Sequence, residues 1–272
     1  MAQHMKDRVV ALAGPRKAEE MAKLVEKMGG TPLIRPAQGT VFLDDEVLRE
    51  SIEDWLKEPA PPWAIFTTGI GLEAIYDMAE QMGALDRLNA TLMQTTIAAR
   101  GYKTVNALKK RGLTPIVRDD DGSTSGLIRA LAPFDLAGQR VILQLHGESA
   151  PKLVEWLESR GAQVEPILPY KHIPPREEDI SLLVDEIIQG KVDAVAFTSA
   201  PQFRFLADFA KDHGRLEAVL EAFRGPVIAV AVGKVTAQGL REEGITRLLV
   251  PEDERMGSMM VELGRYFAQS AN

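Results

Sequence analysis

The sequence contains one unit twice, about 132 residues apart, and this internal repeat constrains the fold more than any single motif does. Residues 8–10 (RVV) match residues 140–142 (RVI) at an offset of 132, and residues 66–68 (FTT) match residues 197–199 (FTS) at 131. The register is kept at Gly29 and Gly161, Gly83 and Gly214, Gly101 and Gly233, Thr104 and Thr236, and Gly112 and Gly244. Solenoid repeats run roughly 20–50 residues, so a period of this length is a whole domain. We therefore expect two similar lobes with a cleft between them.

Composition supports two ordinary globular domains and excludes several kinds of partner. The chain has 272 residues, of which 45% are hydrophobic and 26% charged, and each half is near the usual domain size of about 100–150 residues. The sequence shows no long apolar run and no leader, so we expect a cytoplasmic protein without a membrane partner. A net charge of −7 argues against nucleic acid as the main partner.

Cysteine and histidine usage bounds the chemistry. The chain has no cysteine, which removes disulfides, thiolate metal sites and thiol nucleophiles together. Its four histidines include no pair at metal-ligand spacing. The acidic run 119–121, followed by Gly122, lacks the first and last ligands of a calcium loop, because Val117 and Ile128 stand there. We expect no metal site.

Apolar strand-like runs alternate with helical patterns in both halves, which is typical of an α/β fold with parallel sheets covered by helices on both faces. The predicted strands are Val9–Ala13, Ala64–Thr68, Thr96–Arg100, Pro115–Val117, Val141–Leu145, Ala194–Ser199, Val227–Val232 and Arg247–Val250. Apolar residues at helical spacing within 21–28 and 153–157 predict helices that end at Gly29 and Gly161. The expected fold class is two similar doubly wound parallel-sheet lobes.

Two extended stretches bounded by proline interrupt this alternation, at residues 32–36 and at residues 166–170 running on to Pro174-Pro175. They occupy equivalent places in the repeat. Because proline limits pairing inside a sheet, we expect a two-stranded hinge here, with lobes of 1–36 plus 173–272 and of 37–172. Two consecutive lobes cut near Gly138 are the alternative that the sequence leaves open.

A glycine motif at residues 69–74 (GIGLEA) follows a strand and opens a helix, as in dinucleotide-binding proteins. It does not follow the first strand of its lobe, and the next strand ends in Ala99-Arg100 where a ribose-binding acid is expected. Its counterpart, residues 200–203 (APQF), contains no glycine. The context therefore argues against nicotinamide binding.

Hydroxyl residues recur at the junctions between a predicted strand and the helix that follows it. They are Thr67-Thr68, Thr104, Thr198-Ser199 and Thr236. Serine and threonine are favoured helix N-caps, so capping is one interpretation of each residue. Helix N-termini at the carboxyl ends of parallel strands also bind anions, so ligand binding by the whole set is the other.

Four segments of the chain, in sequence order, are AIFTTGIGLEA, GAQVEPILPYKHIPP, AVAFTSAPQFRFL and VGKVTAQGLREEG. By the order and spacing of these segments, the chain resembles the uroporphyrinogen-III synthase family over nearly its full length. The resemblance implies two α/β lobes joined by a two-stranded ladder. It also implies a cofactor-independent lyase that closes the linear tetrapyrrole hydroxymethylbilane to uroporphyrinogen III, with inversion of the last ring and loss of water.

Carried over residue by residue, the resemblance marks Thr68, Thr104, Tyr170, Ser199 and Thr236 as sensitive positions, and Gly69 and Ala200 adjoin two of them. Tyr170 is the best candidate to donate a proton to the leaving hydroxyl, although an aromatic residue in a hinge can also serve packing alone.

The substrate carries carboxylates on every pyrrole. Helix N-termini could bind them with help from Arg16, Arg100, Lys103 or Lys171, because steering by a basic surface is not expected at this net charge. Two places depart from the family pattern. Residues 13–16 (AGPR) stand where Thr-Arg-Pro is common, so Arg16 is either the usual arginine or a solvated residue of the first helical turn, and Thr68 stands where serine is commoner.

A second class of function stays open. Two lobes and a hinge also describe a non-catalytic cytosolic module that closes on a small ligand. In either case we expect a monomer.

Overall fold

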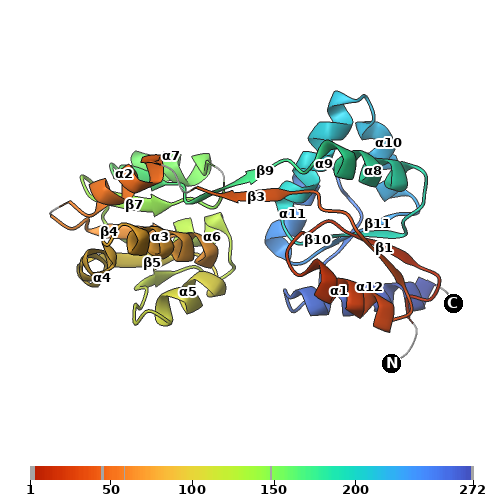
Figure 1. Ribbon diagram of the computed structural model, residues 1–272, viewed down its shortest axis with the longest axis horizontal. Coiled ribbons are helices and arrows are strands. Elements are labelled where there is room, and N and C mark those ends of the chain that lie inside the picture. The colour runs from red at the N-terminus through yellow and green to blue at the C-terminus, as the bar shows by residue number, and fades with distance from the viewer. Residues whose placement is uncertain (1–3, 44–45, 58, 148, 271–272) are drawn as a thin grey trace. The chain divides into compact units, whose positions relative to one another are not determined.

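The computed structural model describes residues 4–43, 46–57, 59–147 and 149–270. It divides into two compact α/β units (Figure 1). The first unit combines Met1–Gly39 with Ile173–Asn272, and the second unit is the continuous segment Thr40–His172. None of the helices in the described ranges has the length and apolar character needed to cross a membrane.

The first unit is built on a five-stranded sheet in the order β12-β11-β10-β1-β2, in which every pairing is parallel. Its strands are β1 (Val9–Leu12), β2 (Thr31–Ile34), β10 (Ala194–Phe197), β11 (Ile228–Ala231) and β12 (Leu248–Leu249). Its helices are α1 (Ala18–Lys27), α8 (Glu177–Ile188), α9 (Ala200–Asp212), α10 (Leu216–Arg224), α11 (Lys234–Glu242) and α12 (Met256–Ser270). The central strands are apolar throughout because helices cover both faces of the sheet.

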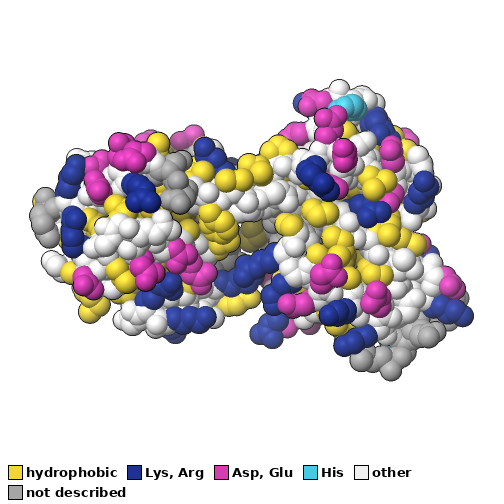
Figure 2. Space-filling model, in the orientation of Figure 1, with side chains coloured by type: hydrophobic (Ala, Val, Ile, Leu, Met, Phe, Trp, Pro, Cys, Tyr) yellow, Lys and Arg dark blue, Asp and Glu magenta, His cyan; other side chains and the backbone are white. Residues whose placement is uncertain are grey.

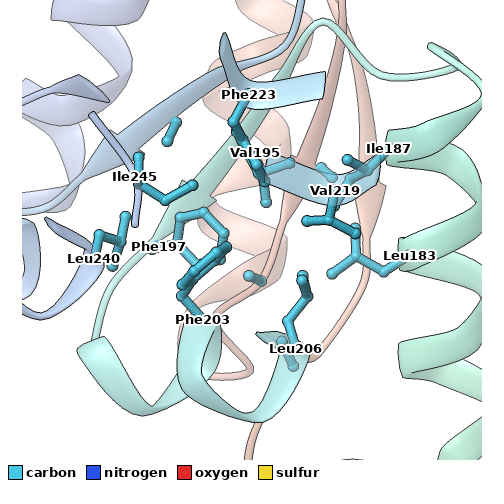
Figure 3. Close-up of a cluster of buried hydrophobic side chains, with 14 of the residues drawn as sticks. Leu183, Ile187, Val195, Phe197, Phe203, Leu206, Val219, Phe223, Leu240 and Ile245 are labelled. Carbon is cyan, nitrogen blue, oxygen red and sulfur yellow. The ribbon is translucent and has the colours of Figure 1, made fainter. Parts of the chain in front are cut away.

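Alternation along the strands divides the first unit's core into two layers. Val10 and Leu12 face α1 and α12, whereas Ala11 belongs to the layer under α8 to α11. Phe197, Phe203 and Phe223 pack together in that second layer (Figure 3), with ring centroids 5.6–6.3 Å apart. The small alanines of β1 and β11 that face this layer leave room for these rings.

The second unit repeats this plan. Its sheet has the order β6-β5-β4-β7-β8, again entirely parallel. Its strands are β4 (Trp63–Phe66), β5 (Thr96–Ala99), β6 (Val117–Arg118), β7 (Arg140–Gln144) and β8 (Gln163–Ile167). Its helices are α2 (Glu46–Trp55), α3 (Gly69–Gln81), α4 (Leu85–Gln94), α5 (Tyr102–Lys109), α6 (Thr124–Leu131) and α7 (Pro151–Ser159). One core layer lies under α2 to α5, and the other under α6 and α7.

The two sheets have the same strand order once the repeat is taken into account. At an offset of 131 or 132, β1 and β2 correspond to β7 and β8, and β4 to β6 correspond to β10 to β12. Each sheet therefore combines the first two strands of one repeat with the last three of the other. The predicted fold class, two parallel α/β lobes with a small two-stranded sheet, is confirmed.

The two-stranded sheet consists of β3 (Gly39–Phe42) and β9 (Tyr170–Ile173), which are antiparallel. The second predicted stretch contains β9, which is followed directly by Pro174-Pro175, so this half of the hinge prediction is correct. The first stretch does not contain β3. Pro32 is in β2 and Pro166 is in β8, the outermost strands of the two large sheets. An edge strand tolerates proline because one side of it has no neighbour to receive an N–H bond. Placing a hinge strand at residues 32–36 was wrong.

The first unit also extends three residues further than the sequence indicated, to Gly39 rather than Pro36. Ala37 is fully buried in the first unit's core. Its backbone N–H donates to the carbonyl oxygen of Ala13 over 2.9 Å, so the chain stays attached to the end of β1 beyond the proline.

The helices that follow the central strands make close contacts through small residues in both units. A Cβ on Gly69 of α3 would lie 3.3 Å from the Cβ of Ala107 in α5 and 3.0 Å from the carbonyl oxygen of Lys103. In the first unit, a Cβ on Gly239 of α11 would overlap the Cβ of Ala200 in α9. Gly69 corresponds to Ala200 and Ala107 to Gly239, so the two units place the glycine on opposite helices of the pair.

This contact predicts that Gly239→Ala destabilises the protein by about 1–3 kcal/mol, the usual range for inserting a methyl group into a packed site. Adding Ala200→Gly should restore much of the loss, because the second change removes the methyl group that the first one meets. Urea unfolding of the two single variants and the double variant measures the coupling.

Gly257→Ala in α12 is the matched control, since a Cβ there would meet nothing within 4 Å. It should be neutral or stabilising by up to about 1 kcal/mol, as expected for alanine in a helix. A Gly239→Ala variant as stable as Gly257→Ala would contradict the close packing of α9 on α11.

Candidate functional site

The candidate residues of the second unit gather where β4 and β7 end. These strands are parallel neighbours, with Phe66 paired to Gln144, so the residues that follow β4 lie beside the end of β7. In open α/β sheets, ligands bind outside the carboxyl ends of the strands. This edge therefore brings Thr67 and Thr68 of the first repeat next to Gln144 of the second.

Gln144 holds the turn between β4 and α3. Its side chain is fully buried, and its Oε1 atom accepts the backbone N–H groups of Thr67 and Thr68 over 3.0 and 3.1 Å. The Thr67 hydroxyl donates to the Gln144 carbonyl oxygen over 2.7 Å. A Cβ on Gly71 would overlap the Gln144 carboxamide, so a glycine is needed at 71 to make room for it. The glycine motif at 69–74 is thereby explained by packing.

Thr68 caps α3 and meets Tyr170. The backbone N–H of Gly71 donates to Thr68 Oγ1 over 3.2 Å, so the capping interpretation of Thr68 is confirmed. The same Oγ1 lies 3.1 Å from Tyr170 Oη. Two sequence-predicted residues that are 102 positions apart are thus in direct contact at this edge.

The Tyr170 ring is packed as well as hydrogen-bonded. Tyr170 is the first residue of β9 and is only 2% exposed. Its ring contacts Phe42 of β3 at 6.1 Å and His172 at 5.5 Å between centroids. The packing role considered for this aromatic residue is therefore real, and its hydroxyl is oriented by the end of β4.

Arg100, directly after β5, adds a cation to this part of the sheet edge. Burial lowers the pKa of its guanidinium from the ordinary value, and the nearby Tyr170 and Asp119 oppose that shift. Its Nη1 atom donates to Thr124 Oγ1 over 2.8 Å. An arginine guanidinium keeps its proton in proteins, so this side chain is a cation near Tyr170.

The first unit has an analogous turn between β10 and α9. The Thr198 N–H donates to Gln202 Oε1 over 2.8 Å, and Gln202 Nε2 donates to Thr198 Oγ1 over 2.9 Å. The Ser199 hydroxyl donates to Gln38 Oε1 over 2.6 Å. Ser199 stands at the N-cap of α9, but its side chain accepts no helix N–H, so capping by this hydroxyl was a wrong interpretation. Ala200 follows it and packs on α11.

Thr104 and Thr236 are not caps either. The N-caps of α5 and α11 are Gly101 and Gly233, which puts each threonine at the third helical residue. Their side chains are 1% and 6% exposed. Within the described part of the chain, neither hydroxyl has a hydrogen-bond partner. Neither is among the fully buried side-chain atoms that lack a partner, so both oxygens keep some exposure. Helix capping therefore explains neither threonine.

Acidic side chains of the chain itself cover the N-termini of α5 and α11. Asp119 accepts the Gly101 N–H over 2.5 Å, and a Cβ on Gly233 would overlap the Glu254 carboxylate. In α9, Pro201 removes one N–H donor. These helix ends offer less attraction to a ligand anion than the sequence suggested, because the N-terminal dipole already meets a carboxylate.

The basic candidates differ in their surroundings. Arg16, Lys103 and Lys171 are exposed, and Arg16 precedes α1 instead of standing in its first turn. Lysine, arginine and acidic side chains are intermixed over the face of each unit seen in Figure 2. Arg100 is therefore the one of the four candidates that is partly buried at a strand end.

The acidic run 119–121 organises its own loop. Asp119 accepts N–H groups of Gly101 and Gly122, and Asp121 accepts both the N–H and the hydroxyl of Ser123. The Ser123 bonds and Arg129 lower the Asp121 pKa to about 2. Among the described residues, no group of three or more histidine, aspartate or glutamate side chains could hold a metal ion.

Sequence reasoning missed the glutamines. Gln144, Gln202 and Gln38 hold the candidate turns in both units, yet none of them was singled out. A signal for Gln144 was present, since it ends an otherwise apolar buried strand and its repeat counterpart is Leu12.

Comparison with known proteins gives one family. Residues 19–261 match the family model described as uroporphyrinogen-III synthase HemD. A mutant uroporphyrinogen III synthase from the extremely thermophilic bacterium Thermus thermophilus is similar in structure, with a TM-score of 0.82 and 35% identity. The similarity covers 97% of this chain and 100% of that one.

Two curated relatives are similar over most of their length. The uncharacterized protein YjjA of Bacillus subtilis (strain 168) is 53% identical over 96% of each chain. A putative uroporphyrinogen-III synthase of Methanothermobacter thermautotrophicus is 27% identical over 92% of this chain and 94% of its own.

The burial of Thr104 and Thr236 gives a stability prediction. Thr104→Val and Thr236→Val should change the free energy of unfolding by less than about 0.5 kcal/mol or stabilise the protein, because the change removes no hydrogen bond within the described part of the chain. Ser123→Ala is the matched control. Its hydroxyl accepts the Gly126 N–H at the start of α6, so its loss should cost about 0.5–2 kcal/mol. If urea unfolding shows the threonine variants losing as much as Ser123→Ala, the two hydroxyls have a structural partner after all.

Proposed function

The chain belongs to the uroporphyrinogen-III synthase family, and we propose that it is an active enzyme that converts hydroxymethylbilane to uroporphyrinogen III. The observation that carries the proposal is the contact between Tyr170 and Thr68 at the carboxyl ends of the second unit's strands. It supplies a phenol, held in a fixed position, at the place where an α/β sheet binds its ligand.

The proposed reaction needs a proton and a defined geometry. The substrate's terminal hydroxyl leaves as water once it receives a proton, and the remaining azafulvene is attacked by the substituted carbon of the far pyrrole. The resulting spiro intermediate fragments and recloses with the last ring inverted. Closure without inversion gives the type I isomer, so the enzyme must favour one transition-state geometry over another. This is cyclisation with loss of water, the chemistry of a lyase.

Tyr170 is the proposed general acid. A tyrosine hydroxyl can donate to a leaving oxygen within hydrogen-bond reach. Arg100 supports this role electrostatically, because a charged guanidinium near the phenol favours release of its proton.

The other candidates are proposed to bind substrate. Thr68, Gly69 and Thr104 belong to the second unit, and Ser199, Ala200 and Thr236 to the first. The hydroxyls of Thr104 and Thr236 have no hydrogen-bond partner in the described part of the chain, so each can donate to a substrate carboxylate or accept a pyrrole N–H. On this proposal the protein acts as a cytoplasmic monomer without a metal or organic cofactor.

The test is product analysis. The purified protein is given freshly prepared hydroxymethylbilane, the products are oxidised, and the type I and type III isomers are separated by chromatography. We expect type III in clear excess over a protein-free control. Type I alone, at the uncatalysed rate, would contradict the proposal and favour a non-catalytic ligand-binding module.

Tyr170→Phe separates the acid role from packing. The change keeps the ring against Phe42 and His172 and removes only the hydroxyl. Formation of type III should slow by roughly 10²–10⁴-fold, the usual scale for general acid catalysis, while the unfolding midpoint barely moves.

Tyr170→Ala is the matched comparison, because it empties the volume of a buried ring. It should lower the free energy of unfolding by about 3 kcal/mol or more. A Tyr170→Phe enzyme with the parental rate and isomer ratio would refute the acid role and leave orientation of the substrate as the whole mechanism.

A further inference from the structure

We infer that Gln144 is a positioning residue that fixes the direction of the hydrogen bond between Thr68 and Tyr170, so that the threonine hydroxyl donates and the phenol accepts. Tyr170 then directs its own proton to an acceptor other than Thr68. The direction of this bond follows from the donors and acceptors around it. Only its consequence for catalysis rests on the proposed function.

The groups around the Gln144 carboxamide determine its orientation. Two backbone N–H groups, of Thr67 and Thr68, point at one end of it over 3.0 and 3.1 Å. A backbone N–H can only donate, so that end must be the oxygen. The amide nitrogen therefore faces the other way, toward Thr68 Oγ1 at 3.2 Å and the carbonyl oxygen of Leu145.

Thr68 Oγ1 takes part in three hydrogen bonds. It receives the Gly71 N–H over 3.2 Å and the Gln144 Nε2–H over 3.2 Å. A hydroxyl has two acceptor lone pairs and one proton. Both lone pairs are filled by groups that can only donate, so the single proton is the one atom left to bridge the 3.1 Å to Tyr170 Oη.

The Tyr170 phenol is the acceptor of the hydrogen bond from Thr68. Tyr170 Oη accepts from Thr68, and its O–H is thereby turned toward another acceptor. Hydrogen bonds in a chain polarise one another, so a phenol that accepts a bond becomes a better donor. On the proposed function, that acceptor is the leaving hydroxyl of the substrate, and the chain runs from Gln144 through Thr68 to Tyr170.

The first unit shows what is particular to this arrangement. Its glutamine, Gln202, also accepts a turn N–H, but its Nε2 donates to Thr198, the counterpart of Thr67. Gln144 comes from a strand instead of a helix, and its Nε2 donates to Thr68, the counterpart of Ser199. The glutamine amide thus holds the turn in both units. In the second unit it also orients the Thr68 hydroxyl, which contacts Tyr170.

The experiment reads the hydrogen bond at Tyr170 directly. Infrared spectra of protein with ring-labelled tyrosine give the phenol C–O stretching band, whose frequency differs between a phenol that accepts and one that does not. The Tyr170 band is assigned by subtracting the Tyr170→Phe spectrum. Thr68→Val removes the donor, and Gln144→Glu keeps an acceptor for the two backbone N–H groups but removes the amide that fills Thr68 Oγ1.

We expect the Tyr170 band to shift in Thr68→Val and in Gln144→Glu, and to stay at the parental position in Thr68→Ser. Gln202→Glu is the matched control, because it makes the same change in the first unit at a glutamine whose amide donates to Thr198, not to the Thr68 hydroxyl that meets Tyr170. It should leave the Tyr170 band unchanged. Thr68→Val alone decides whether Thr68 donates to Tyr170, should the buried charge of Gln144→Glu prevent folding.

Activity tests the consequence separately. Thr68→Val and Gln144→Glu should slow type III formation by roughly 10–100-fold through kcat, part of the loss expected for removing a general acid, and Thr68→Ser should restore most of it. A parental band position in folded Thr68→Val or Gln144→Glu would overturn the inference even in an active enzyme. A parent protein that forms only type I would end the proposed function, and the spectra would still decide the direction of the bond.

Discussion

The pairing of β4 with β7, and of β1 with β10, is the constraint on which the rest of the molecule depends. Each pairing joins a strand of one repeat to a strand of the other, so neither sheet can form from one repeat alone. The same pairings bring together the loops that follow these strands. Thr67 and Thr68 meet the buried Gln144 only because β4 and β7 end side by side. The turn geometry that orients Tyr170 is therefore a direct product of sheet topology.

The two units solve the same packing problems with exchanged residues. Each pair of closely packed helices needs a small residue on both helices. The second unit has Gly69 on α3 and Ala107 on α5, whereas the first unit has Ala200 on α9 and Gly239 on α11. An amide is needed at each turn, and it comes from β7 in one unit and from α9 in the other. Where the amide is Gln144, the position of its counterpart Gln202 is occupied by Gly71, which leaves space for it. The backbone plan is shared by the two units while the identity of each contributor is free to change.

Sequence reasoning found the parts of the fold that periodicity encodes. The apolar runs at 9–13 and 194–199 became β1 and β10 because buried parallel strands need no polar face. It placed the second hinge strand correctly but put the first at residues 32–36, because proline is tolerated equally on an edge strand and Pro32 does not distinguish the two. It identified Thr68 and Tyr170, yet it took Thr104 and Ser199 for possible caps. A hydroxyl accepts a helix N–H only when the helix begins at the right residue. The sequence pattern does not determine the helix start to within one to three residues.

The discontinuous first unit has a consequence for how the chain is made. The second unit is one continuous segment, so its sheet can close as soon as β8 has left the ribosome. β1 has no such prospect, because β10, its partner in the middle of the first sheet, follows about 180 residues later. At about 5–20 residues per second, the β1–α1–β2 segment is made roughly 10–40 s before β10 and longer before α12, which complete the core layer of Val10, Leu12 and Met21. This segment therefore has an incomplete core during that interval, and we expect the aggregation hazard of the first unit's biogenesis to lie in α1 and the two strands beside it.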